Sequence, residues 1–296
     1  MNPGVAAIVL NYNGLADTAR CLESLARADG RLRPLVVDNG SDDGAADALA
    51  THFPEVTLVR SPVNLGFAGG CNLGLETACA QGADYLLLLN NDTVVAQDFL
   101  APLLELAARP GVGVVGPRVF YTDGRVWSDG GLVDRRTGAV RQLGIGRLPG
   151  PPVSRSVDFL PGCALLFSRE TYQAVGPFDP RFFMFFEDVD WCLRAGRLGL
   201  ECWLAPASRV WHSVSGTIGR GSPASVYYMT RNRLLLVRKL RQSRAPAYRV
   251  LATELPRQLV SSALRGDRSH SAAVARGALD FLRGRFGPAP ARGGGG

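Results

Sequence analysis

The chain has 296 residues, of which 46% are hydrophobic, so it is long enough to bury a substantial core in one large domain. Its net charge of +7 fits a nucleic acid, an anionic membrane surface or a phosphorylated substrate without choosing among them. The six cysteines form no C-x-x-C pair, and no apolar run approaches the roughly 20 residues that span a bilayer. We therefore expect reduced core cysteines, no signal peptide, no transmembrane helix and a cytoplasmic location.

Strand and helix signals alternate along the first part of the chain. Continuous apolar runs, which are typical of buried parallel strands, lie at 5–10, 34–39, 56–61, 85–90 and 112–117. Helical spacing of apolar residues predicts helices at 15–28, 44–53, 71–81 and 99–108. This alternation predicts an α/β fold with a mostly parallel, doubly wound sheet and helices on both faces.

The second part of the chain is less regular. Residues 118–157 are rich in Gly, Pro and Arg, and we expect hairpins and loops there, covering the carboxyl edge of the sheet. A buried strand is predicted at 162–168 and an amphipathic basic helix at 225–240. The final GPAPARGGGG is typical of a disordered tail. These boundaries predict a main domain at 1–220 with halves at 1–117 and 118–220, a basic helical extension at 221–283, and a tail at 284–296.

Polar residues follow four of the predicted strands. They are Asn11-Tyr12-Asn13-Gly14, Asp38-Asn39-Gly40-Ser41-Asp42, the Gly-rich loop from Asn64 to Asn72, and Asn90-Asn91-Asp92. Each of these by itself is ordinary turn chemistry. Because ligands of open parallel sheets bind beyond the carboxyl ends of the strands, the four together predict a nucleotide pocket. No P-loop signature occurs and no G-x-G-x-x-G follows the first strand, which disfavours P-loop and dinucleotide sites.

Residues 182–191, FFMFFEDVDW, set three acids against five large apolar side chains. Carboxylates are costly to desolvate, so acids in such surroundings need a partner or a chemical purpose. A structural interpretation is that Glu187 and Asp188 start a helix and that Asp190 pairs with Arg194 at i,i+4. Residues 182–191 alone do not distinguish a structural role for these acids from a catalytic one.

Six segments together resemble the family 2 inverting glycosyltransferases. NYNG at 11–14, VVDNGSDDG at 36–44, NLGFAGGCNLGL at 64–75 and LLLNNDTVV at 87–95 are similar to the donor half of these enzymes. The acceptor half resembles GCALLFSRETYQAVGPFDPRFFMFFEDVDWCLRAGRLG at 162–199 and VWHSVSGT at 210–217. Order and spacing match over about residues 4–240, and the likeness is strongest to bacterial rhamnosyltransferase-type members that build surface polysaccharides.

The resemblance implies a GT-A fold, a nucleotide-diphosphate-sugar donor and a divalent metal, Mg²⁺ or Mn²⁺. By position it implies these donor-binding residues: Asn11, Asn13, Asp38, Asn64, Asn72, Asn90, Asn91 and Asp92. Asn90-Asn91-Asp92 stands where the family has its D-x-D metal motif, so Asp92 is left as the principal carboxylate ligand, with His212 as an imidazole ligand. A hydrogen-bonded structural histidine is the alternative for His212.

The resemblance also answers what the acids at 187–190 are for. It makes Asp188 the catalytic base that deprotonates the acceptor hydroxyl, with Glu187 hydrogen-bonding the acceptor. A carboxylate with a pKa near ~4 is a weak base for an alcohol. The apolar wall and the neighbouring acids should raise the pKa of Asp188 and improve the match.

The expected donor is dTDP-rhamnose, with UDP-sugars next, and the expected acceptor is a glycan or a lipid-linked glycan. No nucleic-acid-binding module is present, so that class of partner is disfavoured. The basic helix is predicted to face either solvent or anionic lipid at the inner face of the plasma membrane, through Arg231, Arg233, Arg238, Lys239 and Arg241.

Two other functions compete with glycosyl transfer. One is a sugar-nucleotide pyrophosphorylase, although the chain has NYNGLADTARC where that class has a Gly-rich basic signature. The other is a non-catalytic protein that binds sugar nucleotides or glycans. Release of diphosphate from a nucleotide triphosphate plus a sugar phosphate would indicate a pyrophosphorylase. Binding without consumption of the sugar nucleotide would indicate a non-catalytic protein.

Overall fold

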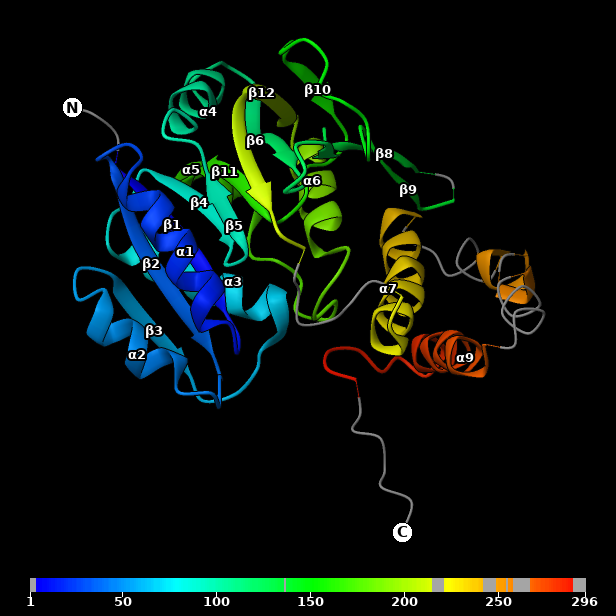
Figure 1. The fold of residues 1–296 in the computed structure, drawn as a ribbon. Coiled ribbons are helices and arrows are strands. Elements are labelled where there is room, and N and C mark those ends of the chain that lie inside the picture. The colour runs from blue at the N-terminus through cyan, green and yellow to red at the C-terminus, as the bar shows by residue number, and fades with distance from the viewer. Residues whose placement is uncertain are drawn as a thin grey trace.

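The computed structural model describes residues 4–135, 137–214, 221–241, 249–253, 255–257 and 267–289. The strands of its main sheet are β1 (Val5–Asn11), β2 (Leu32–Asn39), β3 (Thr57–Ser61), β4 (Tyr85–Asn90), β5 (Thr93–Val95), β6 (Val112–Phe120), β7 (Val126–Ser128), β10 (Arg155–Val157), β11 (Ala164–Ser168) and β12 (Glu201–His212). Their order is β10-β12-β6-β11-β4-β1-β2-β3, with β5 beside β12 and β7 beside β6 (Figure 1). A separate hairpin joins β8 (Gly131–Asp134) to β9 (Ala139–Gln142).

Helices α1 to α6 cover the two faces of this sheet, and α7 and α9 lie to one side of it (Figure 1). They are α1 (Leu15–Ala26), α2 (Ala45–His52), α3 (Gly66–Ala80), α4 (Leu100–Ala107), α5 (Arg169–Val175), α6 (Glu187–Arg197), α7 (Pro223–Arg241) and α9 (Arg268–Leu282). Alternate residues of β1 enter different cores: Val5 and Val9 pack with α1 and α4, and Ile8 packs with α3 and α6. Because both faces of the sheet are covered, its strands are apolar throughout, which is why the sequence shows continuous runs.

The predicted α/β class is confirmed, with a mostly parallel central sheet. Strands β4, β1, β2 and β3 run parallel, so their carboxyl ends share one edge. Strand β11 is antiparallel to both neighbours, β4 and β6, and β12 runs parallel to β6. The sequence did not predict β12, because its pairing with β6 shifts register between Ala205 and Arg209 and this irregularity interrupts the strand pattern.

Helix α3 begins five residues earlier than predicted, at Gly66 rather than Cys71. Glycines lower helix propensity, so the run GFAGG looks like a loop when it is considered alone. The tertiary structure uses Gly70 of this run, and Gly74 one turn further on, for close packing: a Cβ at Gly70 would lie 2.4 Å from Leu10, and one at Gly74 would lie 2.4 Å from Ile8. The helix therefore lies closer to the sheet than larger residues would permit.

The C-terminal helices α7 and α9 pack against each other at one end of the molecule (Figure 1). The described part of the predicted tail, residues 284–289, contacts the fold: the amide of Gly287 donates to the carbonyl of Arg181, and the amide of Ala289 donates to the Tyr228 hydroxyl. Residues 290–296 of that predicted tail lie outside the described residues. Within the described ranges, none of the helices has the length and apolar character needed to cross a membrane.

Candidate active site

The carboxyl ends of β1 and β2 meet in a buried polar cluster. Asn11 and Asp38 are paired in register, and the Nδ2 of Asn11 donates to Oδ1 of Asp38 at 2.9 Å. The Ser41 hydroxyl donates to the same carboxylate oxygen at 2.6 Å. The structure thus brings the first two predicted donor-binding residues together. Ser41, which no prediction singled out, completes the cluster from within the motif VVDNGSDDG.

Two further predicted residues shape the backbone around this cluster. Asn13 has a positive φ of 50°, and its Oδ1 accepts from the amide of Asp42 at 3.0 Å. Asn91 turns toward the start of α1, where its Nδ2 donates to the Thr18 hydroxyl at 3.1 Å. Both side chains therefore fix loops at the rim of the sheet, and their contact with a donor stays a prediction.

Asn64 and Asn72 each bind backbone of this chain. The Oδ1 of Asn64 accepts from the amide of Gly66 at 2.8 Å, just before α3. The amide group of Asn72 bonds to both the N–H and the carbonyl of Phe178, at 2.8 and 2.9 Å. Residues 66–72 are consequently helix, anchored to the segment that leads to the acids, and not a loose loop over the pocket.

Asp92 and His212 lie side by side although 120 positions separate them in sequence, because β12 pairs with β5 through His212 and Thr93. The Nε2 of His212 is 2.9 Å from Oδ1 of Asp92, and both side chains are buried. Asn90 approaches the same imidazole nitrogen at 3.5 Å. The predicted metal ligands are thus brought together at the carboxyl end of β4.

This donor set fits a hard divalent cation. The carboxylate of Asp92 and the buried Oδ1 of Asn90, which has no hydrogen-bond partner in the protein, are oxygen ligands, and His212 adds a nitrogen. The described residues contain no group of three His, Cys, Asp or Glu that could hold a metal alone. Phosphate oxygens of a donor would complete the coordination, as they commonly do for Mg²⁺. A structural role for His212 would use the same 2.9 Å contact with Asp92.

Glu187 and Asp188 form the first turn of α6. The amide of Gly162 donates to Oδ2 of Asp188 at 2.8 Å, and the amide of Val189 donates to Oδ1 at 2.7 Å. Gly162 has little room for a side chain, because a Cβ there would lie 3.0 Å from the ring of Phe67 and 3.4 Å from Asp188. The carboxylate of Asp188 is therefore fixed in position against the turn before β11.

The surroundings give the two acids different protonation behaviour. Burial raises the pKa of Glu187 well above its ordinary value, and the adjacent charge of Asp188 raises it further. Burial also raises the pKa of Asp188, but the N–H groups of Gly162 and Val189 partly offset that rise. Burial therefore favours the neutral form of Glu187, while the two backbone N–H groups favour the charged form of Asp188.

The turn before β11 connects the two predicted halves of the site. The amide of Asn90 donates to the carbonyl of Cys163 at 3.0 Å, and the next residue back, Gly162, holds Asp188. Burial raises the pKa of the Cys163 thiol, and the carboxylates of Asp92 and Asp188 raise it further. The charges of both carboxylates act on this one thiol, so Asp92 and Asp188 both lie near this turn.

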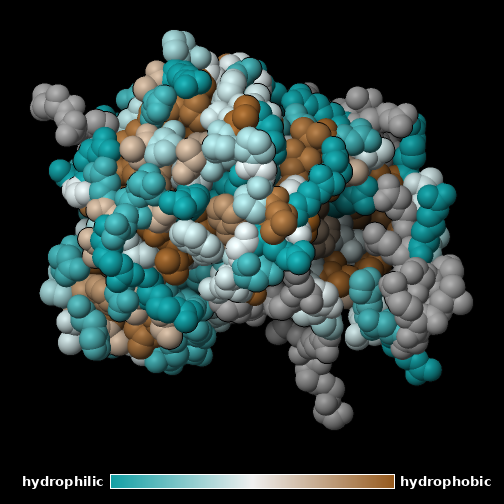
Figure 2. All heavy atoms as spheres, turned by 45° about the horizontal axis from the view of Figure 1, so that its top comes forward, coloured by the Kyte–Doolittle hydropathy of each residue, from teal (hydrophilic) through white to brown (hydrophobic). Residues whose placement is uncertain are grey.

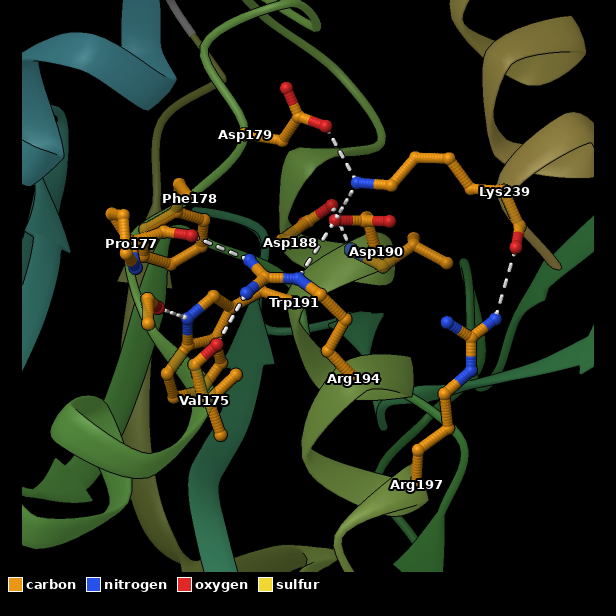
Figure 3. A network of polar contacts seen from close by, with 12 residues as sticks. Val175, Pro177, Phe178, Asp179, Asp188, Asp190, Trp191, Arg194, Arg197 and Lys239 are labelled. Carbon is orange, nitrogen blue, oxygen red and sulfur yellow. Dashed lines mark hydrogen bonds and ion pairs between the residues drawn. The ribbon is translucent and has the colours of Figure 1, made fainter. Parts of the chain in front are cut away.

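Asp190 has the structural role that its spacing predicts. It accepts from Nε of Arg194 at 3.1 Å and from Nζ of Lys239 at 2.7 Å (Figure 3). The same Lys239 nitrogen is 2.6 Å from Asp179. This buried ion network ties α6 to α7 and leaves Asp190 no freedom for catalysis.

Helix α7 holds the backbone of the FFMFF run from behind. Asn232, which is fully buried, donates from Nδ2 to the carbonyls of Phe182, Met184 and Phe185 at 2.8, 2.7 and 3.0 Å. Arg231 donates to the carbonyl of Phe182 at 3.0 Å. Held in this way, the run keeps three non-glycine residues at positive φ, which are Phe183, Phe185 and Phe186.

The expectation of a basic helix that faces solvent or lipid is therefore wrong for Arg231 and Lys239. Arg231 is 0% exposed, and Lys239 lies in the ion network. Arg238 lies 5.6 Å from the ring centroid of Phe281 on α9, and Arg233 is half-buried. The side chain of Arg241 lies outside the described residues. Arg231, Arg238 and Lys239 thus contact protein.

Glu187→Gln should make the protein more stable at neutral and alkaline pH. Because the folded-state pKa of Glu187 lies above its unfolded value of ~4.3, the folded state binds more protons between the two, and this stability is lost as pH rises through the folded pKa. A neutral glutamine removes that loss, so its Tm should exceed that of the wild type by at least ~2 °C at pH 8 and match it near pH ~4.

Thermal unfolding followed by circular dichroism at both pH values tests this expectation. Glu23→Gln, on an exposed position of α1, is the matched control and should change Tm little at either pH. A Tm difference for Glu187→Gln that is the same at both pH values would show that Glu187 is not held neutral by its burial.

Comparison with solved structures identifies the fold. GalNAc-T7 with UDP, GalNAc and Mn²⁺ superimposes with a TM-score of 0.62 at 15% identity, over 80% of this chain and 48% of that one. The mannosyltransferase PcManGT from Pyrobaculum calidifontis, in complex with GDP-Man and Mn²⁺, gives 0.57 at 18% identity, over 95% and 88% of the two chains. The chain therefore has the GT-A fold of glycosyltransferases, as expected from its motifs.

The sequence comparisons agree with the fold. The family model described as "Glycosyl transferase family 2" matches residues 6–176, and the chain belongs to this family. An N-acetylglucosaminyl-diphospho-decaprenol L-rhamnosyltransferase of Mycobacterium tuberculosis is 29% identical, over 76% of this chain and 80% of the relative. The dTDP-rhamnosyl transferase RfbF of Shigella flexneri is 24% identical, over 81% of each chain. The protein is accordingly a glycosyltransferase, which disfavours the pyrophosphorylase and the non-catalytic alternatives.

Proposed function

We propose that the protein transfers a rhamnose-like sugar, with inversion, from a nucleotide-diphosphate donor to a hydroxyl of a lipid-linked glycan. One observation carries the proposal. Of the five buried side-chain atoms without a hydrogen-bond partner among the described residues, four surround the candidate site: Asn90 Oδ1, Trp127 Nε1, Glu187 Oε2 and His212 Nδ1. Buried polar atoms are almost always satisfied in proteins, so this cluster fits a site whose partners are the polar groups of a ligand.

The aromatic side of this site is formed by Trp127 on β7. Its ring meets the ring of His212 edge-on, with the centroids 4.7 Å apart. Its buried indole N–H is one of the four atoms and is a donor for an oxygen of a sugar or phosphate. Trp127 therefore supports a sugar position between the proposed metal ligands and the rest of the acceptor half.

The two proposed ends of the reaction use different groups. Asp92, His212 and Asn90 would hold a divalent cation, which when bound neutralises the diphosphate that leaves. Asp188 would take the proton of the acceptor hydroxyl, and protonated Glu187 would donate a hydrogen bond to the acceptor. The raised pKa of Asp188 improves its match to an alcohol, as the sequence argument required.

The names of the relatives support the choice of substrates. The mycobacterial relative is named for an N-acetylglucosaminyl-diphospho-decaprenol acceptor, and the Shigella relative is named for a dTDP-linked rhamnose donor. We propose the same two substrate classes for this chain, with synthesis of a cell-surface polysaccharide at the cytoplasmic face of the membrane as the setting.

A direct transfer assay tests the proposed function. Purified protein is incubated with Mn²⁺, dTDP-rhamnose and a short-chain N-acetylglucosaminyl-diphospho-prenol, and products are identified by mass spectrometry. The expected product is the acceptor plus one deoxyhexose, with dTDP released. Transfer from UDP-glucose or GDP-mannose in preference to dTDP-rhamnose would overturn the proposed donor, and consumption of no donor with any lipid-linked acceptor would overturn the proposed substrates.

Asp92→Asn provides the metal control for this assay. The variant should lose the rise in Tm that Mn²⁺ plus dTDP gives the wild type, because the principal carboxylate ligand is gone. Asp98→Asn, whose side chain is 71% exposed and lies six residues further on, should keep it. An unchanged Mn²⁺-dependent rise in Asp92→Asn would show that the cation binds elsewhere.

A further inference from the structure

Residues 135–157, here called the arginine segment, have a composition unlike the rest of the chain. They contain five arginines, at 135, 136, 141, 147 and 155, and no aspartate or glutamate. Three acids from neighbouring segments face it: Asp134 accepts from the Thr137 hydroxyl at 2.8 Å, Asp158 lies 3.5 Å from Arg135, and Asp129 lies 3.4 Å from Arg155. Arg141 and Arg147 are exposed. The segment therefore presents a net positive charge to solvent.

The same segment carries the two most exposed large apolar side chains of the described residues. Leu148 is 79% exposed and Val153 is 68% exposed, and Ile145 between two glycines is 47% exposed. They lie in the stretch GIGRLPGPPVSR, which has no regular structure up to β10. Figure 2 turns the β10 side of the molecule forward and shows apolar side chains at the surface among hydrophilic ones. Apolar tips flanked by arginines are typical of surfaces that enter the interface of an anionic bilayer.

The segment is joined to the candidate active site. Residues 143–147 pair with β7, where the amide of Val126 donates to the carbonyl of Arg147 at 2.9 Å. Gln142 donates to the carbonyl of Trp127 at 2.8 Å, and the Trp127 ring packs on His212. Beneath the segment lies a cavity of about 530 Å³, whose walls include the arginines at 118, 147 and 155. A surface held by this segment would thus lie one strand away from the site.

We propose that the arginine segment is a membrane-docking surface that binds bilayers containing anionic lipid. Arg141 and Arg147 attract the anionic headgroups, and Leu148 and Val153 enter the boundary between headgroups and acyl chains. This surface replaces the basic helix α7, whose Arg231 and Arg238 contact protein, and it lies in a different part of the fold. Vesicle binding requires no sugar transfer, so the proposal stands or falls independently of the proposed function.

Co-sedimentation of the full chain with vesicles tests the proposal. The wild type should bind vesicles of phosphatidylcholine and phosphatidylglycerol but not vesicles of phosphatidylcholine alone, and high salt should weaken the binding. The double variant Arg141→Gln/Arg147→Gln should bind about 25-fold more weakly, since each basic residue near an anionic surface contributes a factor of about five. Arg27→Gln/Arg33→Gln is the matched charge control and should bind as the wild type does; both positions are exposed, one directly after α1 and one on β2.

A second variant separates a bilayer from a soluble polyanion. Leu148→Ser/Val153→Ser should lose at least about tenfold in vesicle binding but should bind polyphosphate as the wild type does. Equal vesicle binding by this variant would show that the segment recognises a polyanion and not a membrane. The proposal is also overturned if the wild type binds neither kind of vesicle, or if both arginine double variants weaken binding equally. All of these side chains are exposed, so circular dichroism should show unchanged folding for every variant.

Discussion

Asp188→Asn should lower kcat by about a thousandfold while the protein still binds the nucleotide donor. Asparagine has nearly the size of aspartate, but it cannot take the proton of the acceptor hydroxyl. Its side chain also keeps one oxygen for the two backbone N–H groups, of Gly162 and Val189, that hold the carboxylate. Transfer rates at saturating acceptor, together with the Tm rise on adding dTDP and Mn²⁺, measure the two effects separately.

Glu187→Gln is the control for this variant. It keeps a side chain that donates a hydrogen bond to the acceptor, so its main effect should fall on the KM for the acceptor and not on kcat.

In the wild type, kcat/KM should fall as pH drops through the raised pKa of Asp188, because the base is lost when it is protonated. Turnover near the wild-type rate in Asp188→Asn would refute the assignment of the base.

Asn232→Asp should lower the free energy of unfolding by about 3 kcal/mol and reduce transfer at the same time. The change replaces a buried NH₂ donor, which holds the carbonyls of Phe182, Met184 and Phe185, with an oxygen that repels them. Without the clamp, the FFMFF backbone is free to leave its positive-φ conformation, and the acids that follow it lose their position. Urea unfolding and the kcat of the folded fraction give the two readouts.

Met229→Ala is the matched control on the same helix. Its side chain is 46% exposed and lies three residues before the clamp, so its effect on stability should stay within about 0.5 kcal/mol. If Asn232→Asp unfolds at the wild-type urea concentration, the three hydrogen bonds do not hold the loop. If it is destabilised but its folded fraction turns over normally, the clamp stabilises the fold without positioning Asp188.

Helix α3, in the predicted donor half, is in direct contact with the FFMFF run, in the predicted acceptor half. Gly66 has a φ of 74°, and a Cβ there would lie 2.4 Å from the ring of Phe183. The amide of Ala68 donates to the carbonyl of Phe183 at 3.2 Å. The Gly-rich start of α3 therefore receives the loop that carries the acids. From the sequence alone these glycines are predicted to lie at the donor, because the residue they accommodate is more than a hundred positions away.

The sequence by itself determined the class of fold and most of the site's residue types. Continuous apolar runs are local signals, and they placed the parallel strands because both faces of this sheet are buried. Polar residues after those strands had to converge, since parallel strands end at one edge, and Asn11, Asp38 and Asp92 lie there as expected. The i,i+4 pair of Asp190 and Arg194 is likewise local and was predicted correctly.

The tertiary structure decided which side chains contact each other and which of the predicted surface charges are buried. Periodicity reports that a helix has one buried face, but it does not report what that face contacts, so Arg231 and Lys239 looked like surface charges until α7 packed on the FFMFF run. The N–H of Gly162 that fixes Asp188, and the pairing of β12 with β5 that brings His212 to Asp92, join residues far apart in the chain. Such contacts arise only when the chain folds, because no local spacing encodes them.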